Sequence, residues 1–310
     1  MGMTRTNSAA SSYCLTTTLK RGGEMNKSGL LQRLIDDKKF IMAPGVFDAL
    51  TAKVAEEQGF QAVYMTGYGT CASNFGFPDL GFLTMSEMVQ NASRIADAVD
   101  IPLIADADTG YGNPLNVIRT VREYEKAGIA AIHIEDQQWP KRCGHMTGKK
   151  VIEADQMVEK IKAAVDTRES MLIIARTDAI ATHGFDQAIE RGSKYAEAGA
   201  DIIFIEAPVT REQVEDIPKF FKMKPLLINM APRTPNVGAD ELHRMGYSIA
   251  LYPGVCLAAI IPALREEMKV LKDTGRQKEL QDYLEAFMAL NAFLKVPEFT
   301  NLEQKYKGNG

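Results

Sequence analysis

Four stretches of the sequence repeat one pattern: AEEQGFQAVYMT (55–66), YEKAGIAAIHIED (124–136), YAEAGADIIFIEA (195–207) and LHRMGYSIALYP (242–253). Each begins as a helix-like segment, passes through a glycine and continues as a short apolar run. A glycine just after a helix is typical of the C′ position, where the backbone takes a positive φ. The nearly continuous apolar runs are typical of parallel strands that are buried on both faces.

With the similar apolar runs elsewhere in the chain, the sequence contains eight strand candidates, which is the number that closes a (β/α)8 barrel. They are FIMAP (40–44), AVYMT (62–66), PLIADAD (102–108), AAIHIED (130–136), MLIIART (171–177), DIIFIEA (201–207), PLLINM (225–230) and SIALYP (248–253). Helix-forming segments alternate with them, so we predict an α/β fold, a parallel (β/α)8 TIM-type barrel. An open doubly wound sheet is the alternative, but PGVFDA after the first strand is not the GxGxxG loop typical of that fold.

The predicted barrel domain covers residues 26–295 and includes a long helical segment, 254–295, after the last strand. This is more helix than a barrel needs, so we expect the extra C-terminal helices to pack on a neighbouring subunit. Residues 1–25 are rich in Ser and Thr, and we expect a disordered extension there, with a transit peptide as the alternative. Residues 296–310 are assigned to a C-terminal tail.

Composition and charge exclude several classes of protein. With 45% hydrophobic and 25% charged residues, the chain is not intrinsically disordered. A net charge of −4 gives no whole-chain attraction to nucleic acid or to an anionic membrane, so we expect neither as a partner. No apolar run approaches the roughly 18–20 residues that span a bilayer. Four cysteines without a CxxC pair favour a reduced, cytoplasmic protein.

Polar residues end most of the predicted strands: Thr66, Asp106, Asp108, Glu135, Asp136, Arg176, Asp178, Glu206 and Asn229. In a barrel of this type the C-terminal strand ends meet at one mouth, where such enzymes place their chemistry. A single Asp or Asn at such a position is equally well explained as a helix N-cap. The whole set is not, because burying unpaired charges is expensive.

The segment DADTGYGN (106–113) is the sharpest local motif. Asp106 and Asp108 are two residues apart on a predicted strand, so both should point to one face. Two adjacent carboxylates repel each other unless they share a proton or a cation. Hard oxygen ligands favour Mg²⁺, with Mn²⁺ as an alternative, and Glu135 and Asp79 are candidates to complete the shell.

The second motif is the polar loop KRCGHMTGKK (141–150) after the fourth predicted strand. Lys141 and His145 flank Cys143, and a cationic setting can tune a thiol for chemistry. Gly144 and a second glycine after it would allow the loop to move as a lid. The alternative is an ordinary basic loop with an incidental cysteine.

With these motifs the sequence resembles the isocitrate lyase and phosphoenolpyruvate mutase superfamily, from Lys39 to about Phe293. The shared marks are DADTGYG, IED, KRCGH and ARTDA (175–179). KRCGH is specific to the carbon–carbon lyase branch, and the surrounding sequence is most similar to the 2,3-dimethylmalate lyase and methylisocitrate lyase group. The resemblance implies a barrel, a Mg²⁺ site and a homotetramer in which C-terminal helices are exchanged between subunits.

The resemblance also implies roles for individual residues. For the metal, they are Asp106 as direct ligand and Asp79, Asp108 and Glu135 as ligands mostly through water. For the substrate, Thr66, Gly67 and Tyr68 hold the keto-acid carboxylate, Arg176 binds the same end, and Glu206 and Asn229 line the other side. In the loop, Lys141, Gly144 and His145 bind the substrate or stabilise its charge, and Cys143 is the proton donor. The general base stays open, with Tyr64 and a water on the metal as candidates.

The implied reaction is the Mg²⁺-dependent cleavage of a 2-hydroxy dicarboxylate, such as 2,3-dimethylmalate, into an α-keto acid such as pyruvate and a short carboxylic acid. Methylisocitrate lyase activity is the alternative, although Met146 stands where those enzymes tend to have a basic residue. INMAPRTPN (228–236) lacks two glycines common in dimethylmalate-type relatives, which leaves the distal pocket open. Alternatives of another class are a phosphonate mutase or hydrolase and a non-catalytic barrel.

Overall fold

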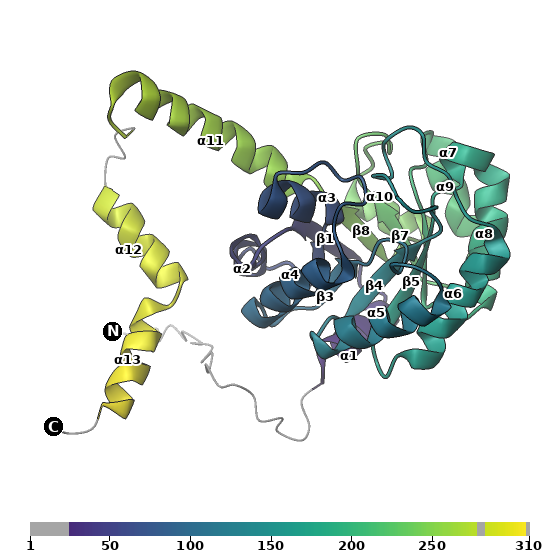
Figure 1. The fold of residues 1–310 in the computed structure, drawn as a ribbon, viewed down its shortest axis with the longest axis horizontal. Helices are drawn as coiled ribbons and strands as arrows, with labels where there is room; N and C mark the ends of the chain where they lie inside the picture. Colours follow the sequence, from purple (N-terminus) through teal and green to yellow (C-terminus); the bar gives the residue numbers. More distant parts are fainter. Residues whose placement is uncertain (1–24, 278–282, 308–310) are drawn as a thin grey trace, which may run out of the picture. The chain divides into compact units, whose positions relative to one another are not determined.

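Eight parallel strands close into a barrel in the order β1 to β8 (Figure 1). The computed structural model describes residues 25–277 and 283–307, so nearly all of the predicted N-terminal extension lies outside the described residues. The strands are β1 (Ile41–Val46), β2 (Val63–Met65), β3 (Leu103–Asp106), β4 (Ala131–Glu135), β5 (Leu172–Thr177), β6 (Ile202–Ile205), β7 (Leu226–Asn229) and β8 (Ile249–Tyr252). The predicted (β/α)8 barrel is confirmed, and each predicted strand overlaps an observed one.

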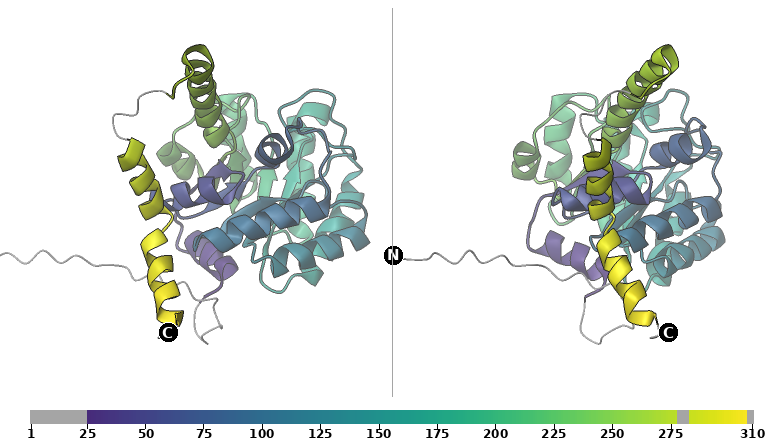
Figure 2. Two further views of the ribbon diagram at one scale, coloured as in Figure 1. Left: turned by 60° about the vertical axis from the view of Figure 1, so that its left-hand side comes forward. Right: turned by 90° about the vertical axis from the view of Figure 1, so that its left-hand side faces the viewer.

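Helices alternate with the strands, and several of them pack against the outer faces of the strands (Figures 1 and 2). They are α1 (Lys27–Asp36), α2 (Ala49–Glu57), α3 (Gly67–Thr70), the π-helix η1 (Cys71–Phe75), α4 (Met85–Ala98), α5 (Pro114–Lys126), α6 (Ala154–Thr167), α7 (Ile180–His183), α8 (Phe185–Glu197), α9 (Arg211–Phe220) and α10 (Ala239–Met245). Reciprocal capping boxes begin α2, α4, α5 and α9 and satisfy amide groups that a helix start would leave unpaired.

The glycines of the four repeats occupy the turns that the sequence predicts. Gly59, Gly128, Gly199 and Gly246 have φ angles of 82°, 77°, 103° and 112°, a backbone region that costs other residues free energy. Each turn sends the chain from the end of a helix into the next strand. The repeated motif is therefore the sequence form of the helix-to-strand connection.

Two sets of buried apolar residues hold the barrel together. Alternate strand residues, such as Ile104, Ile174 and Leu227, form a cluster with Leu31 and Ile35 of α1. The strand residues of the opposite parity pack with the surrounding helices in a larger cluster. The strand alternation thus fills the barrel interior with the first set, while the second set joins strands to helices.

The chain after Pro253 forms a separate compact unit. It contains α11 (Val255–Thr274), α12 (Tyr283–Phe293) and α13 (Val296–Tyr306), so the segment assigned to a C-terminal tail is largely helical. No residue of α11 or α13 is buried. Among the described residues, no helix is both long enough and apolar enough to span a membrane.

Candidate active site

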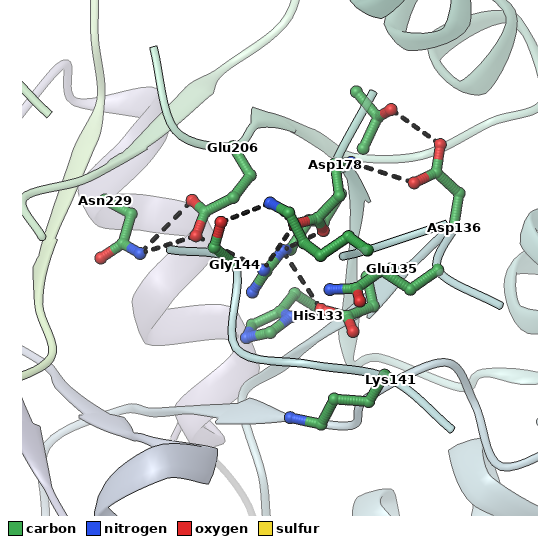
Figure 3. Close-up of polar contacts among 12 residues, drawn as sticks. His133, Glu135, Asp136, Lys141, Gly144, Asp178, Glu206 and Asn229 are labelled. Carbon is green, nitrogen blue, oxygen red and sulfur yellow. Dashed lines mark hydrogen bonds and ion pairs between the residues drawn. The ribbon is translucent and has the colours of Figure 1, made fainter. Parts of the chain in front are cut away.

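The predicted site residues gather at the C-terminal ends of the strands (Figure 3). Three strands end at a site residue: β3 at Asp106, β4 at Glu135 and β7 at Asn229. Tyr64 lies in β2 and Arg176 in β5, while Thr66 and Gly67 follow β2 and Glu206 follows β6. All of these residues are buried, whereas Tyr68 is exposed. The hydroxyl of Thr66 caps α3 by accepting from the amide of Gly69, so the cap interpretation also holds for this residue.

One group of carboxylates surrounds the ammonium of Lys141. The Lys141 Nζ atom lies 2.6 Å from Asp79 Oδ1 and 2.6 Å from Asp108 Oδ1. Burial lowers the pKa of Lys141, but the carboxylates, Asp108 first, outweigh it and hold that pKa well above its usual value. Asp106 joins the group because its Oδ1 accepts from the amide of Asp108 at 2.9 Å.

The structure corrects the predicted geometry of this acidic pair. The strand β3 ends at Asp106, and Asp108 has a φ of 48°, in the left-handed region. The two residues therefore do not share a strand face, and the alternation argument was wrong for them. They come together because the chain turns back after Asp106, a conformation that Asp tolerates better than most residues.

This acidic group has too little positive charge and too few donors for its oxygens. Glu135 Oε1 is buried without a hydrogen-bond partner, and Glu135 Oε2 lies 3.2 Å from Arg176 Nε. Burial raises the pKa of Glu135 well above its usual value, and burial with the neighbouring carboxylates raises that of Asp108 to about 7. In the described part of the chain no three His, Cys, Asp or Glu side chains have the spacing of a metal site, and the Lys141 ammonium lies between Asp79 and Asp108. An unpartnered oxygen in an all-carboxylate set fits a hard divalent cation.

A second group of ionisable residues, centred on Arg176, is tightly paired. Arg176 Nε and Nη2 donate to the two oxygens of Asp178 at 2.9 and 3.1 Å. The other neighbour of Arg176 Nη2 is Glu206 Oε1 at 3.4 Å, and that carboxylate also accepts from Asn229 Nδ2 at 3.1 Å. The guanidinium lies 5.2 Å from the ring centroid of Phe204. These contacts fix its orientation at the mouth.

The loop with Cys143 covers the mouth between the two groups. The amide of Cys143 donates to the carbonyl of Asp79 at 3.2 Å. A Cβ atom on Gly144 would overlap Glu206 and Arg176, so only glycine permits this close approach. His145 Nε2 lies 3.4 Å from Glu206 Oε1. Burial raises the pKa of the Cys143 thiol to about 11, so the sulfur carries a proton at neutral pH.

Tyr64 pairs with a histidine that the sequence analysis did not assign to the site. Its hydroxyl lies 2.9 Å from His133 Nε2, which is also 3.6 Å from Asp106 Oδ1. Burial lowers the pKa of His133 to about 4 and raises that of Tyr64, so both groups are neutral. His133 sits inside an apolar strand, and nothing in the sequence shows which strand residue faces it.

Polar atoms on the far side of the mouth also lack partners. Asn229 Oδ1 and Thr234 Oγ1 are buried without a hydrogen bond, and the contact of His145 Nε2 is the long one of 3.4 Å with Glu206 Oε1. Buried polar atoms normally have partners, so this side has free capacity for a polar ligand. Asn229 and His145 were predicted as site residues and Thr234 was not; it follows Arg233, whose amide donates to His145 Nδ1, a contact that the sequence does not reveal.

Comparison with known proteins identifies the superfamily to which the chain belongs. A family model for phosphoenolpyruvate phosphomutase matches residues 31–272. The chain belongs to the phosphoenolpyruvate mutase and isocitrate lyase superfamily. It is 46% identical to a 2,3-dimethylmalate lyase from Eubacterium barkeri, over 91% of this chain and 99% of the relative. It is 43% identical to a 2-methylisocitrate lyase from Aeropyrum pernix, over 84% and 85%.

Solved structures give the same assignment. A crystal structure of 2,3-dimethylmalate lyase has a TM-score of 0.87 and 38% identity, with 92% of this chain and 97% of that chain covered. A phosphonopyruvate hydrolase, solved with oxalate and Mg²⁺, has a TM-score of 0.83 and 29% identity, with 92% and 100% covered. The predicted superfamily and the predicted carbon–carbon lyase class are confirmed.

Proposed function

We propose that this lyase cleaves a 2-hydroxy dicarboxylate of the 2,3-dimethylmalate type into an α-keto acid, such as pyruvate, and a short carboxylic acid. The observation that carries the proposal is the position of Cys143, on a loop in which Lys141 contacts the open carboxylate group and Gly144 lies against Glu206 and the fixed Arg176. The 46% identity to a 2,3-dimethylmalate lyase across almost the whole of both chains supports the choice of substrate.

The open carboxylate group is the proposed site of Mg²⁺, with Mn²⁺ as an alternative. Asp106, Asp108, Glu135 and Asp79 would hold it, and their oxygen donors and the unpartnered Glu135 Oε1 support this assignment. When bound, the ion supplies a Lewis acid that lowers the cost of a negative charge on the 2-hydroxyl oxygen. With the ion in place, Lys141 would be free to leave its two carboxylates.

The chain's own residues orient the substrate and move the protons. Arg176 would bind a substrate carboxylate, for which its guanidinium is already held in place. We propose that the 2-hydroxyl proton passes to the Tyr64 oxygen while the Tyr64 hydroxyl gives its own proton to the neutral His133 Nε2, which lies 2.9 Å away. The C2–C3 bond then breaks, its electron pair forms an enolate on the departing fragment, and the Cys143 thiol protonates the enolate carbon. His145 would donate a hydrogen bond where that charge develops, and Asn229, which holds Glu206 through its Nδ2, would line the same side.

A substrate panel tests this function. Malate, 2-methylmalate, 2,3-dimethylmalate, isocitrate and 2-methylisocitrate should be assayed for keto acid with a coupled dehydrogenase. Met146 itself supplies no cation for a third carboxylate, so we expect the dicarboxylates to have kcat/KM values about two orders of magnitude higher. A preference of that size for 2-methylisocitrate would favour the alternative lyase, which the 43% identical relative supports. Turnover of a phosphonate alone would contradict both.

The proposed assembly is a homotetramer in which the C-terminal helices pack on neighbouring subunits. Exposed apolar side chains on these helices, among them Leu264, Met268, Phe287 and Phe299, support it, because a patch of this kind marks an interface. We place the enzyme in the cytoplasm on the ground of its scattered cysteines. Sedimentation of the full chain should give a tetramer, and a single monomeric species would contradict the assembly.

A further inference from the structure

Lys149, at the end of the loop that carries Cys143, has its charge buried inside the protein. Its side chain is 1% exposed, and its Nζ lies 2.8 Å from Asp178 Oδ1. The same ammonium donates to the carbonyl of Gly144, within the loop itself. An ammonium buried without partners is strongly unfavourable, so these two contacts are what allow Lys149 to lie there.

The carboxylate that receives Lys149 also holds the arginine of the site. Asp178 Oδ1 accepts from both Lys149 Nζ and Arg176 Nη2, and Asp178 Oδ2 accepts from Arg176 Nε. Figure 3 shows Gly144 and Asp178 close together beside Glu206. One carboxylate therefore joins the loop to the residue proposed to bind the substrate.

We propose that Lys149 is a positioning residue that latches the Cys143 loop over the mouth and, through Asp178, links loop closure to the orientation of Arg176. Opening the loop would withdraw Lys149 and remove one of the two cations that share Asp178. Closing it restores both and fixes Gly144 against Glu206 and Arg176 at the same time. The catalytic meaning of the latch rests on the proposed function, but the latch itself does not.

The next residue supplies a matched control. Lys150 is exposed, and no ion pair or hydrogen bond of its ammonium occurs in the described residues. Lys149→Met and Lys150→Met each remove one positive charge from the same end of the loop, but only the first removes the contacts with Asp178 and Gly144.

The reactivity of Cys143 reports loop opening without any need for substrate. The Cys143 thiol is half-buried with the loop closed, so iodoacetamide should alkylate it faster from the open form, and the rate should rise with the open population. We expect Lys149→Met to raise the Cys143 alkylation rate by about 10²-fold, the size typical of breaking a buried pair. Lys150→Met should leave it within about twofold. Loss of a nearby cation alone would slow alkylation by disfavouring the thiolate, so an increase identifies opening.

Peptide mapping by mass spectrometry at Cys143, with Cys256 of α11 as the reference in the same sample, gives the rates. Equal rates in Lys149→Met and Lys150→Met would overturn the latch. If Lys149→Met does not fold, Asp178→Asn breaks the pair from the other side and should also accelerate alkylation. An unchanged rate in that variant overturns the proposal as well.

A kinetic comparison separates the latch from the proposed function. Lys149→Arg keeps the charge and should retain protection of Cys143, and it should recover most of the kcat that Lys149→Met loses. Slow alkylation in the parent and fast alkylation in Lys149→Met, with no turnover of any 2-hydroxy acid by either, would leave the latch intact and reject the function. Normal kcat and KM in Lys149→Met would overturn the link to Arg176.

Discussion

Glu135 and Asp136 are neighbours in sequence at the end of β4, yet they lie in opposite environments (Figure 3). Glu135 belongs to the open carboxylate group, and its Oε1 has no hydrogen-bond partner. Asp136 accepts from Thr177 Oγ1 at 2.7 Å, from Tyr195 OH at 2.8 Å and from the amide of Asp178 at 3.0 Å. It also pairs with Arg191 Nη1 at 3.2 Å.

The difference shows which carboxylates hold the fold and which have capacity for a ligand. A buried carboxylate with four donors is satisfied, and it ties β4 to β5 and α8. A buried carboxylate with a free oxygen pays a desolvation cost that a bound cation would offset. We therefore expect the stability of the fold to depend more on Asp136, and the binding of a ligand to depend more on Glu135, whose Oε2 contacts Arg176 while its Oε1 stays unpartnered.

The largest expected effect comes from removing the proposed cation from the open group. Chelation with EDTA should abolish turnover, and added Mg²⁺ or Mn²⁺ should restore it. The reason is that the cation held by these oxygens would stabilise the negative charge on the 2-hydroxyl oxygen of the substrate. The keto-acid assay before and after chelation is the measurement. Full turnover in a metal-free sample would show that catalysis does not depend on a cation bound by the open carboxylate group.

Cys143 lies on the loop that bridges the two groups, and Cys143→Ser removes only the acidic thiol. A hydroxyl is a much weaker acid, so kcat should fall by about 10²–10⁴-fold, the usual contribution of a general acid. Substrate binding and Mg²⁺ affinity should change little. Cys71→Ser and Cys256→Ser serve as controls and should stay within a few-fold of the parent. A Cys143→Ser enzyme with most of the parent kcat would exclude this proton donor.

Asp136→Ala removes the buried carboxylate that has all its hydrogen-bond partners. It leaves Arg191 buried with one carboxylate partner fewer and takes the acceptor from Thr177 and Tyr195. The free energy of unfolding should fall by about 3–5 kcal/mol, as for other buried pairs that lose one member. Urea denaturation measures it, and a change below about 1 kcal/mol would contradict a structural role.

Glu135→Gln tests the open side and should have the smallest effect on the fold. Without metal, the variant should be about as stable as the parent in urea, because an unsatisfied carboxylate is replaced by a neutral amide. Its Mg²⁺ affinity should drop by about 10–100-fold, in line with the loss of one group around a metal. A stability loss as large as that of Asp136→Ala would erase the distinction between the two residues.

The sequence predicted the barrel well because each strand is encoded locally. An apolar run after a helix-ending glycine needs no distant partner to be recognised, and Gly59, Gly128, Gly199 and Gly246 all behave as expected. The sequence also predicted which polar residues lie at the mouth, since the C-terminal ends of the strands meet there.

The contacts between those residues were beyond the sequence. The turn at Asp108 depends on a left-handed backbone that alternation does not reveal, and the pairing of Lys141 with Asp79 depends on two loops folding together. The separate roles of Glu135 and Asp136 are likewise invisible in IED, because they follow from the direction in which each side chain leaves the strand. Thr234 and His133 were missed because only a neighbour in space distinguishes them from ordinary residues.

Calorimetric titration of Mg²⁺ into chelated protein measures whether the open carboxylate group takes a divalent cation. We expect one ion to bind per chain, with binding lost in Asp106→Asn and retained in Lys150→Met. Absence of binding in the parent chain, or binding that survives Asp106→Asn unchanged, would contradict it.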